Sequence, residues 1–497
     1  MPYIIQNKNL DKNRVFILQK SELEKRLDPL YYSLNIFGFL KTTNFKTKTI
    51  REIAKYTISG FGVGKEEQDL TEKGFIQIRP TNLDEFGSLK FDRNIYLGNE
   101  FLDKKNNIIQ KGDILFNNTN SQELVGKTAY FDLDGTYLHS NHITRIKVDE
   151  NIIRPKFLWL LLNFYQKRKI FYTICTNWNN QSGVGIELLN SLKIVVPDFE
   201  TQDKIIAIYE TAFAYKKQSE SEANKLLASI DDYLLGELGI TLPAENNITE
   251  SVENQQGFEL NKHNSVVKKG RLFLTRFSEI GGGRFDPDYH KKYFSALLSA
   301  LEKSLYKKSK LGVHLSEINY GASVSNNYVK NGIPLLRIKD LKRNEINVSE
   351  VVYLPEEMRK TLGNCFVKEN DFLISRSGTI GIVSIVPKNI EGFAFGSFMI
   401  KFSLKEDFKI DKHFLSFYLN SSLLVKLIER EKIGAIQGNI TIPTIKNFPL
   451  ILPPLEKQKE IANRIQNIRN NANNLKINAK QKLHQAKAEI ETMILGE

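Results

Sequence analysis

The sequence predicts an α/β (α+β) fold in which two mixed α/β domains follow one another along the chain, each closed by a long helix. Three observations predict it. The chain has 497 residues, which is too long for one typical domain. Blocks of sequence recur at a nearly constant offset, and coiled-coil spacing of apolar residues closes each half. Two discrete domains fit better than a solenoid, which needs about three or more short repeats.

The recurring blocks show an internal duplication. RLDPLY at 26–31 returns as RFDPDY at 284–289, GFIQIR at 74–79 as GIPLLR at 332–337, and GDIL at 112–115 as NDFL at 370–373, all at an offset of 258. Near the end of each copy, IVVPDFETQ at 194–202 returns as LILPPLEKQ at 450–458, at an offset of 256. Chance similarities would not share nearly the same offset over so many blocks.

Each copy has the same predicted plan. The Asp-Pro pairs at 28–29 and 286–287 place a capping side chain before a proline, which predicts a helix start. Short strand-like runs separated by Gly and Asn follow, at 75–78, 114–116, 335–338 and 372–375. Pro197 and Pro453 end the last strand of each copy, and helical patterning continues beyond them.

The two closing helices have apolar residues that step alternately by four and three, which predicts a coiled-coil seam. A four-residue stutter between Ala479 and Leu483 keeps the apolar residues on one face. The seams favour pairing of the helices with each other, and the alternative is that each helix packs on its own domain. The predicted seam comprises Ile205, Tyr209, Ala212, Leu226, Ile230 and Tyr233 in the first helix, and Ile461, Ile465, Ile468, Leu475, Leu483 and Ile490 in the second.

These patterns set the expected boundaries. The first domain covers residues 1–196 and its helix 197–240. A linker with little apolar content covers 241–264. The second domain covers 265–452 and its helix 453–497.

Composition limits the possible partners. Lys and Arg number 70 against 57 Asp and Glu, a formal net charge of +13, which favours a polyanion such as nucleic acid or an anionic membrane. A merely soluble basic protein remains the alternative. The two cysteines, Cys175 and Cys365, are far apart and lack neighbouring His ligands, so the sequence predicts neither a disulfide framework nor a zinc site. No apolar run approaches the length of a membrane helix, and we expect a cytoplasmic protein.

Motifs that resemble catalytic ones are incomplete. GFGVG at 60–64 is followed by a polar run instead of a helix, and DPDY at 286–289 lacks the second proline of the Asp-Pro-Pro-Tyr signature of amino-methyltransferases. Asp198, Glu200 and Lys204 resemble a nuclease triad, but the second copy does not keep it. His139 and His142 lack a further metal ligand at suitable spacing. We therefore expect a binding protein without catalytic residues, a metal site or a cofactor of its own, and a methyltransferase remains the alternative.

The closing segments and two upstream blocks resemble a known family. PPLEKQ at 453–458 with its helix, and PDFETQ at 197–202 with its own, are similar to the two repeated segments of the specificity subunits of type I restriction-modification systems. DFLISRSGTIG at 371–381 and DILFNNTN at 113–120 resemble a block of that family's target-recognition domains. The similarity covers essentially the whole chain, although Asp198 departs from the usual second proline.

The resemblance implies a non-catalytic reader of double-stranded DNA in a prokaryote. In such a subunit each target-recognition domain reads one half of a split, asymmetric target. The two helices form an antiparallel coiled coil that separates the domains and docks two modification (methyltransferase) subunits, alongside restriction/translocase subunits. S-adenosylmethionine, ATP and Mg would belong to those partner chains. The alternative is a stand-alone, sequence-specific DNA-binding regulator.

Reading of bases requires polar side chains on loops that reach the groove edges. Candidate DNA-binding residues are Arg79, Asn117, Asn118, Asn120, Gln122, Arg337, Lys339, Ser375, Arg376, Ser377 and Thr379. A surface or turn-forming role remains open for each. These loops differ between the copies, so we expect the two halves to read different sequences.

Overall fold

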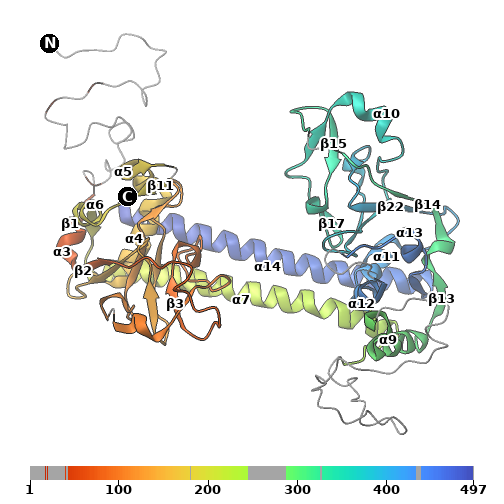
Figure 1. Cartoon of the computed structure of the whole chain (residues 1–497), viewed down its shortest axis with the longest axis horizontal. Helices are drawn as coiled ribbons and strands as arrows, with labels where there is room; N and C mark the ends of the chain where they lie inside the picture. The colour runs from red at the N-terminus through yellow and green to blue at the C-terminus, as the bar shows by residue number, and fades with distance from the viewer. Residues whose placement is uncertain are drawn as a thin grey trace, which may run out of the picture. The chain divides into compact units, whose positions relative to one another are not determined.

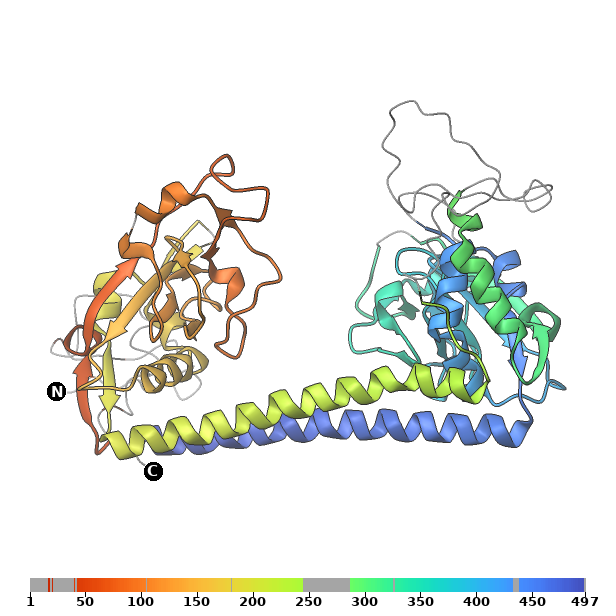
Figure 2. The ribbon, with the colours of Figure 1, turned by 90° about the horizontal axis from the view of Figure 1, so that it is seen from below.

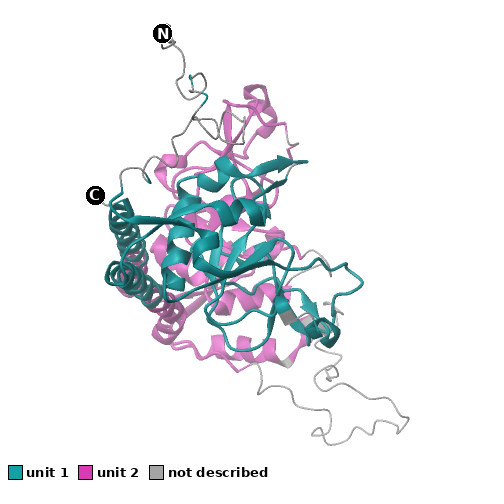
Figure 3. Ribbon diagram, turned by 90° about the vertical axis from the view of Figure 1, so that its left-hand side faces the viewer, with its two compact units in different colours: residues 1–220, 476–497 teal, residues 221–475 magenta. Residues whose placement is uncertain are grey.

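The computed structural model describes residues 17, 20, 40, 43–103, 105–179, 181–244, 287–324, 327–431 and 438–495. The predicted Asp-Pro helix start at 28–29, Asp286 of its counterpart and residues 245–264 of the predicted linker lie outside the described residues. The chain divides into two compact units (Figure 3). Unit 1 consists of residues 1–220 and 476–497, and unit 2 of residues 221–475, so the division runs through both long helices.

Unit 1 contains two main sheets. The first is antiparallel, in the order β2 (Ala54–Ser59), β9 (Ile143–Val148), β5 (Ile114–Asn117) and β7 (Thr128–Tyr130). In the second, β3 (Phe75–Ile78) pairs antiparallel with β4 (Tyr96–Leu97) and parallel with β8 (Tyr137–His139). All four residues of β5 are buried, because this strand lies inside the first sheet between two apolar clusters.

Smaller elements complete unit 1 (Figure 1). The strand β1 (Lys46–Thr49) pairs with β12 (Lys193–Val196), and β10 (Thr176–Trp178), β11 (Gln181–Gly183) and β6 (Thr119–Asn120) form a third small sheet. The helices are α3 (Ile50–Ile53), α4 (Pro155–Lys167), α5 (Ile170–Ile174) and α6 (Ile186–Ser191). Pro155 begins α4, at a position where the missing N–H has no helical partner to lose.

Unit 2 repeats this plan. Its antiparallel sheet has the order β14 (Leu315–Tyr320), β22 (Met399–Leu404), β19 (Phe372–Ser375) and β20 (Val383–Ile385). Its second sheet joins β15 (Ile333–Leu336) to β18 (Val352–Leu354) and, in parallel, to β21 (Ala394–Phe395). The remaining strands are β13 (Lys307–Lys310), β23 (Pro449–Leu452), β16 (Leu341–Lys342) and β17 (Glu345–Ile346), and the short helices are α9 (Lys292–Glu302), α10 (Arg359–Leu362), α11 (Lys412–Leu419), α12 (Ser422–Glu431) and α13 (Ile442–Lys446).

The two units correspond in detail as well as in order. The register shifts once in the edge strand of each antiparallel sheet, between Ala54 and Tyr56 in unit 1 and between Leu315 and Glu317 in unit 2. Such a bulge bends a strand and is kept within families of related structures. The prediction of two tandem mixed α/β domains is therefore confirmed.

A duplicated asparagine holds α4 in unit 1 and α11 in unit 2 against the antiparallel sheet. Asn163 of α4 donates to the Thr128 carbonyl at 2.9 Å, and Asn420, just after α11, donates to the Val383 carbonyl at 2.8 Å and accepts from the Val383 N–H at 3.1 Å. Because a buried amide needs partners for both its oxygen and its nitrogen, each asparagine fixes one helix against one strand.

The long helices are α7 (Phe199–Glu237) and α14 (Leu455–Leu495). Every predicted seam residue is at least partly buried: Ile205, Tyr209, Ala212, Ile461, Ile465, Leu483 and Ile490 are buried, and Leu226, Ile230, Tyr233, Ile468 and Leu475 are half-buried. In unit 1 the first turns of α7 share a cluster with Leu483 and Ile490, and in unit 2 Leu234 and Leu238 share one with Ile461 and Ile465. Within each unit the two helices lie side by side (Figures 1 and 2).

No helix among the described residues has the length and apolar character needed to span a bilayer.

Candidate nucleic-acid interface

The loop containing GFGVG owes its first glycine to a close approach of two backbone segments. A Cβ added at Gly60 would lie 2.0 Å from the His139 carbonyl oxygen, and one added at the equivalent Gly321 would lie 2.3 Å from the Gly396 carbonyl oxygen. No side chain fits at either position. The glycine is therefore explained by packing of the loop against the end of β8 or of β21.

The aspartate that opens each predicted recognition block is buried and paired with a buried cation. Arg145 Nη1 lies 3.1 Å from the Asp113 carboxylate and also donates to the Ile108 carbonyl at 2.6 Å. In unit 2, Lys401 takes the same place. Its Nζ lies 3.7 Å from the Asp371 carboxylate and donates to the Phe366 carbonyl at 3.1 Å. These aspartates position the strand that precedes each recognition loop.

The closing motif of each copy also has a structural role. Gln202 Nε2 donates to the Pro197 carbonyl at 2.8 Å, while its oxygen accepts from the Arg154 N–H at 2.8 Å. Gln458 makes the equivalent bonds to Pro453 and Asp411, at 2.8 and 2.9 Å. Each glutamine ties the start of a long helix to the start of α4 or α11.

The candidate residues of unit 1 gather around the ends of β3 and β5. Asn117 and Asn118 are buried: Asn117 donates to the Leu124 carbonyl at 3.1 Å and Asn118 to the Thr144 hydroxyl at 2.9 Å. A base cannot reach a buried amide, so these two contacts favour the structural alternative. Asn120, Gln122 and Arg79 are half-buried, and Gln122 donates to the Tyr172 carbonyl at 2.8 Å while Arg79 Nε donates to Gln77 at 3.0 Å.

In unit 2 the candidates divide in the same way. Ser375 and Ser377 are buried, and the Ser375 hydroxyl closes the following turn by donating to the Thr379 carbonyl at 2.7 Å. Lys339 pairs with Glu350 at 2.6 Å. The side chain of Thr379 is exposed.

Both candidate arginines of unit 2 lie over aromatic rings. The Arg337 guanidinium lies 6.0 Å from the ring centre of Tyr328, and it also donates to the Glu350 carbonyl at 2.5 Å. The Arg376 guanidinium lies 4.6 Å from the ring centre of Tyr320. Planar guanidinium groups held in this way are suited to bases and phosphates.

Several exposed aromatic side chains beside these loops were missed by sequence reasoning. In unit 2, Tyr320 is 38% exposed and Phe398 is 52% exposed. In unit 1, Trp178 is 46% exposed, and a Cβ added at Gly183 would lie 2.4 Å from its ring. The ring therefore lies across Gly183 in the β10–β11 hairpin with its remaining surface open, as base-stacking aromatics do. The offset of 256 aligns Phe398 with His142, a residue close to the predicted loops. This alignment was the sequence signal that could have identified Phe398.

The two histidines near the predicted loops differ in burial. Burial lowers the pKa of His139 to about 4, and its Nδ1 lies 3.1 Å from the Ile143 carbonyl. Burial also lowers the pKa of His142, with a further contribution from the nearby Arg79. His139 is therefore a packing residue. The described residues contain no cluster of three or more His, Cys, Asp and Glu side chains suited to a metal ion.

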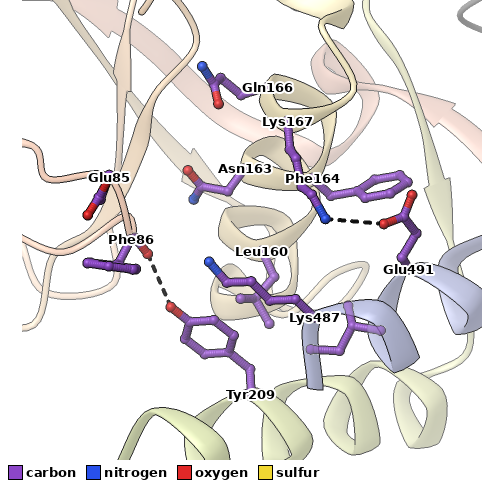
Figure 4. A pocket seen from close by; sticks show the side chains of 11 residues that line it. Glu85, Phe86, Leu160, Asn163, Phe164, Gln166, Lys167, Tyr209, Lys487 and Glu491 are labelled. Carbon is purple, nitrogen blue, oxygen red and sulfur yellow. Dashed lines mark hydrogen bonds and ion pairs between the residues drawn. The ribbon is translucent and has the colours of Figure 1, made fainter. Parts of the chain in front are cut away.

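Unit 1 also has a cavity of about 200 Å³ where α4, α7, α14 and the loop at 84–87 meet (Figure 4). The Tyr209 hydroxyl donates to the Phe86 carbonyl at 3.1 Å, and Glu491 pairs with Lys167 at 3.5 Å and with Arg168 at 3.0 Å. Lys487 points into the cavity, and burial lowers its pKa. These contacts hold the end of α14 in unit 1.

Comparison with known proteins identifies the family. The model of the type I restriction modification DNA specificity domain matches residues 42–228 and 306–485, once in each copy. The chain is 27% identical over 389 residues to the putative type I restriction enzyme MjaX specificity subunit of Methanocaldococcus jannaschii, covering 77% of each chain. It is 29% identical over 176 residues to the MjaVIII specificity subunit of the same organism, covering 34% of this chain and 40% of that one.

A solved structure has a related fold. It is described as the structural basis underlying complex assembly and conformational transition of the type I R-M system. One of its chains matches with a TM-score of 0.50 and 15% identity, over 90% of this chain and 96% of that one. Because the two family matches together cover most of the sequence, this chain belongs to the type I restriction-modification DNA specificity family.

Proposed function

We propose that this specificity subunit reads a split, asymmetric DNA target, with unit 1 on one half-site and unit 2 on the other. The observation that carries the proposal is a framework kept in both copies beside loops that differ. The bulge, the buried ion pair and the glutamine tie occur twice. The residues at the ends of β2, β5 and β8 differ from those at the ends of β14, β19 and β21. One scaffold that presents two sets of side chains fits two different half-sites.

We further propose that α7 and α14 pair as an antiparallel coiled coil that sets the distance between the half-sites. Contacts inside the units support this. In unit 1, Lys482 of α14 lies 4.1 Å from the ring centre of Tyr215 in α7, and in unit 2 Lys457 pairs with Glu237 at 2.7 Å. Within unit 1 the second half of α14 thus meets the first half of α7, and within unit 2 the start of α14 meets the end of α7. A helix of about 40 residues is about 60 Å long, which spans almost two turns of DNA at about 34 Å for each turn.

The chemical steps are assigned in this proposal to partner chains. Two modification subunits would dock on the helices and supply methylation from S-adenosylmethionine, and restriction/translocase subunits would use ATP and Mg. The residues that resemble catalytic motifs support this division, because Gly60 and His139 have packing roles in unit 1. The chain's own contribution is then the choice of sequence.

The test is co-expression with the cognate modification subunit, followed by sequencing that detects methylated bases. We expect a stable complex and one bipartite methylated motif, with binding that weakens steeply as salt rises, because phosphate contacts release counterions. The purified chain should be footprinted alone as a control. Tight sequence-specific binding by the free chain, without complex formation or methylation, would support the regulator and contradict the proposal.

A further inference from the structure

One position at the end of the central recognition strand carries different chemistry in the two units on the same backbone. In unit 1 the Asn118 N–H donates to the His142 carbonyl at 3.0 Å, and its carbonyl accepts from Val184 at 2.8 Å. In unit 2 the Arg376 N–H donates to the Phe398 carbonyl at 2.9 Å, and its carbonyl accepts from Ile440 at 3.1 Å. Asn118 and Arg376 are therefore equivalent.

The surroundings of this position explain why the two side chains take different directions. Asn118 finds two polar partners on the neighbouring strands, donating to Thr144 at 2.9 Å and to Ser59 at 3.4 Å. The pairing of β2 with β9 and of β14 with β22 places Ile400 where Thr144 stands and Tyr320 where Ser59 stands. An inward guanidinium would meet the buried Ile400 and lose its hydrogen bonds to water.

Arg376 accordingly lies over the exposed ring of Tyr320, 4.6 Å from its centre. The Tyr320 hydroxyl accepts from the Ile442 N–H at 3.3 Å, which fixes the ring beneath the guanidinium. Within the described part of the chain, Arg376 has no ion pair or side-chain hydrogen bond, whereas Arg337 and Lys339 are engaged with Glu350. A guanidinium that contacts a ring keeps its N–H groups available for two parallel hydrogen bonds to a ligand.

We infer that Arg376, positioned by Tyr320, reads a guanine in the half-site of unit 2, and that unit 1 reads no base through the equivalent Asn118. The O6 and N7 acceptors of guanine in the major groove match the paired donors of an arginine. This inference rests on the proposed function, because it assumes that unit 2 binds DNA.

The experiment uses the complex with the modification subunit and a library of targets with randomised half-sites. For wild type we expect a bipartite motif with a required guanine in one half-site. Arg376→Ala should relax that one position by about tenfold or more, and Arg376→Gln should shift it toward adenine. Asn118→Ala is the matched control: it should leave the motif of both half-sites unchanged while lowering the melting temperature of unit 1.

Tyr320 is tested as a positioning residue. Tyr320→Leu should lower the preference for guanine over adenine at the same position, whereas Tyr320→Phe, which keeps the ring, should retain most of it. A residue with only a structural role would change the melting temperature and leave that preference unaltered.

Two outcomes overturn the inference while leaving the proposed function intact. In the first, Arg376→Ala weakens methylation of all targets equally and reduces the salt dependence, which is the behaviour of a phosphate contact. In the second, the relaxed position is not a guanine. Absence of any bipartite motif for wild type is a different result, because it rejects the proposed function and the inference together.

Discussion

At the scale of single residues, buried polar groups fix the framework of each unit, and their energies are large because solvent does not screen them. The side chains of Asp113 and Arg145 are 0% and 4% exposed, and their charged atoms lie 3.1 Å apart. Removing the Asp113 charge would leave the Arg145 charge buried with backbone carbonyls as hydrogen-bond acceptors and without the Asp113 carboxylate that balances it. Such an uncompensated charge costs about 3–5 kcal/mol.

We therefore expect Asp113→Asn to lower the free energy of unfolding of unit 1 by about 3 kcal/mol. Both tryptophans of the chain, Trp159 and Trp178, lie in unit 1, so tryptophan fluorescence during urea unfolding follows this unit. Asp203→Asn is the matched control. It breaks an exposed pair with Arg154 and should cost less than about 1 kcal/mol. Equal effects of the two changes would contradict the assignment.

The depressed pKa of His139 predicts a pH dependence of stability. In the folded protein this pKa is about 4, against 6.5 for an exposed histidine, so between these values the unfolded chain binds more protons. The contribution is fully present above pH 6.5 and is lost as pH falls toward 4. A shift of this size corresponds to roughly 3 kcal/mol.

The matched variant is His139→Phe, because unit 2 has Phe395 at the equivalent place. We expect wild type to lose about 3 kcal/mol more than this variant when unit 1 is unfolded at pH 4 instead of pH 7. Comparing the two proteins removes the contribution of the carboxylates, which titrate in both. Parallel stability curves would show that His139 does not titrate in this range.

Sequence reasoning was least informative at this scale. Asn118 and Arg376 occupy equivalent positions of one repeated block, so the sequence predicts the same role for both. The burial of the first and the outward direction of the second depend on Thr144 and Ile400, which lie on another strand. Side-chain direction at a strand end is set by such non-local neighbours, and a local pattern contains no information about them.

At the scale of elements, the period of the apolar residues predicted which faces of α7 and α14 are buried or half-buried. This worked because burial on one face of a helix repeats at a fixed spacing that does not depend on the partner. The period does not show which core each face meets. The first turns of α7 and the last turns of α14 belong to the core of unit 1, while their other ends belong to the core of unit 2.

The face of α14 that packs in unit 1 can be tested with two isoleucines of one helix. Ile490 is 5% exposed and Ile477 is 48% exposed. We expect Ile490→Ala to lower the free energy of unfolding of unit 1 by about 2–4 kcal/mol, through lost burial and the cavity left behind. Ile477→Ala should change it by less than about 1 kcal/mol, as a surface substitution does. Urea unfolding followed by tryptophan fluorescence measures the free energy of unfolding of both variants. Similar losses would contradict the assignment of Ile490, and not Ile477, to the face of α14 that packs in unit 1.

At the scale of the whole molecule, the duplication alone predicted two tandem domains with the same plan, because repeated sequence implies repeated structure. It did not predict that unit 1 is discontinuous. The sequence boundaries separate the final helix from the first domain, whereas residues 476–497 belong to unit 1. Contacts between residues far apart in the chain cannot be predicted from a local sequence pattern.

Because unit 1 is discontinuous, deleting residues 476–497 should unfold unit 1 and leave unit 2 folded. Removing residues 476–497 takes Leu483, Ile490 and Ile494 out of the core that contains Ile205 and Tyr209. At about 2–5 kcal/mol for each large side chain, the loss of these three reaches the 5–15 kcal/mol by which a typical domain is stable. We therefore expect unit 1 to unfold under ordinary conditions.

Unit 2, whose residues 221–475 remain complete, should keep its structure in the same protein. Limited proteolysis with mass spectrometry would then show cleavage throughout 43–196 and protection of 300–430, and the tryptophan emission would match that of unfolded protein. The control is deletion of 490–497, which removes only Ile490 and Ile494 of those three side chains and should weaken unit 1 in part. If the longer deletion left the fluorescence transition of unit 1 unchanged, the C-terminal segment would not belong to its core.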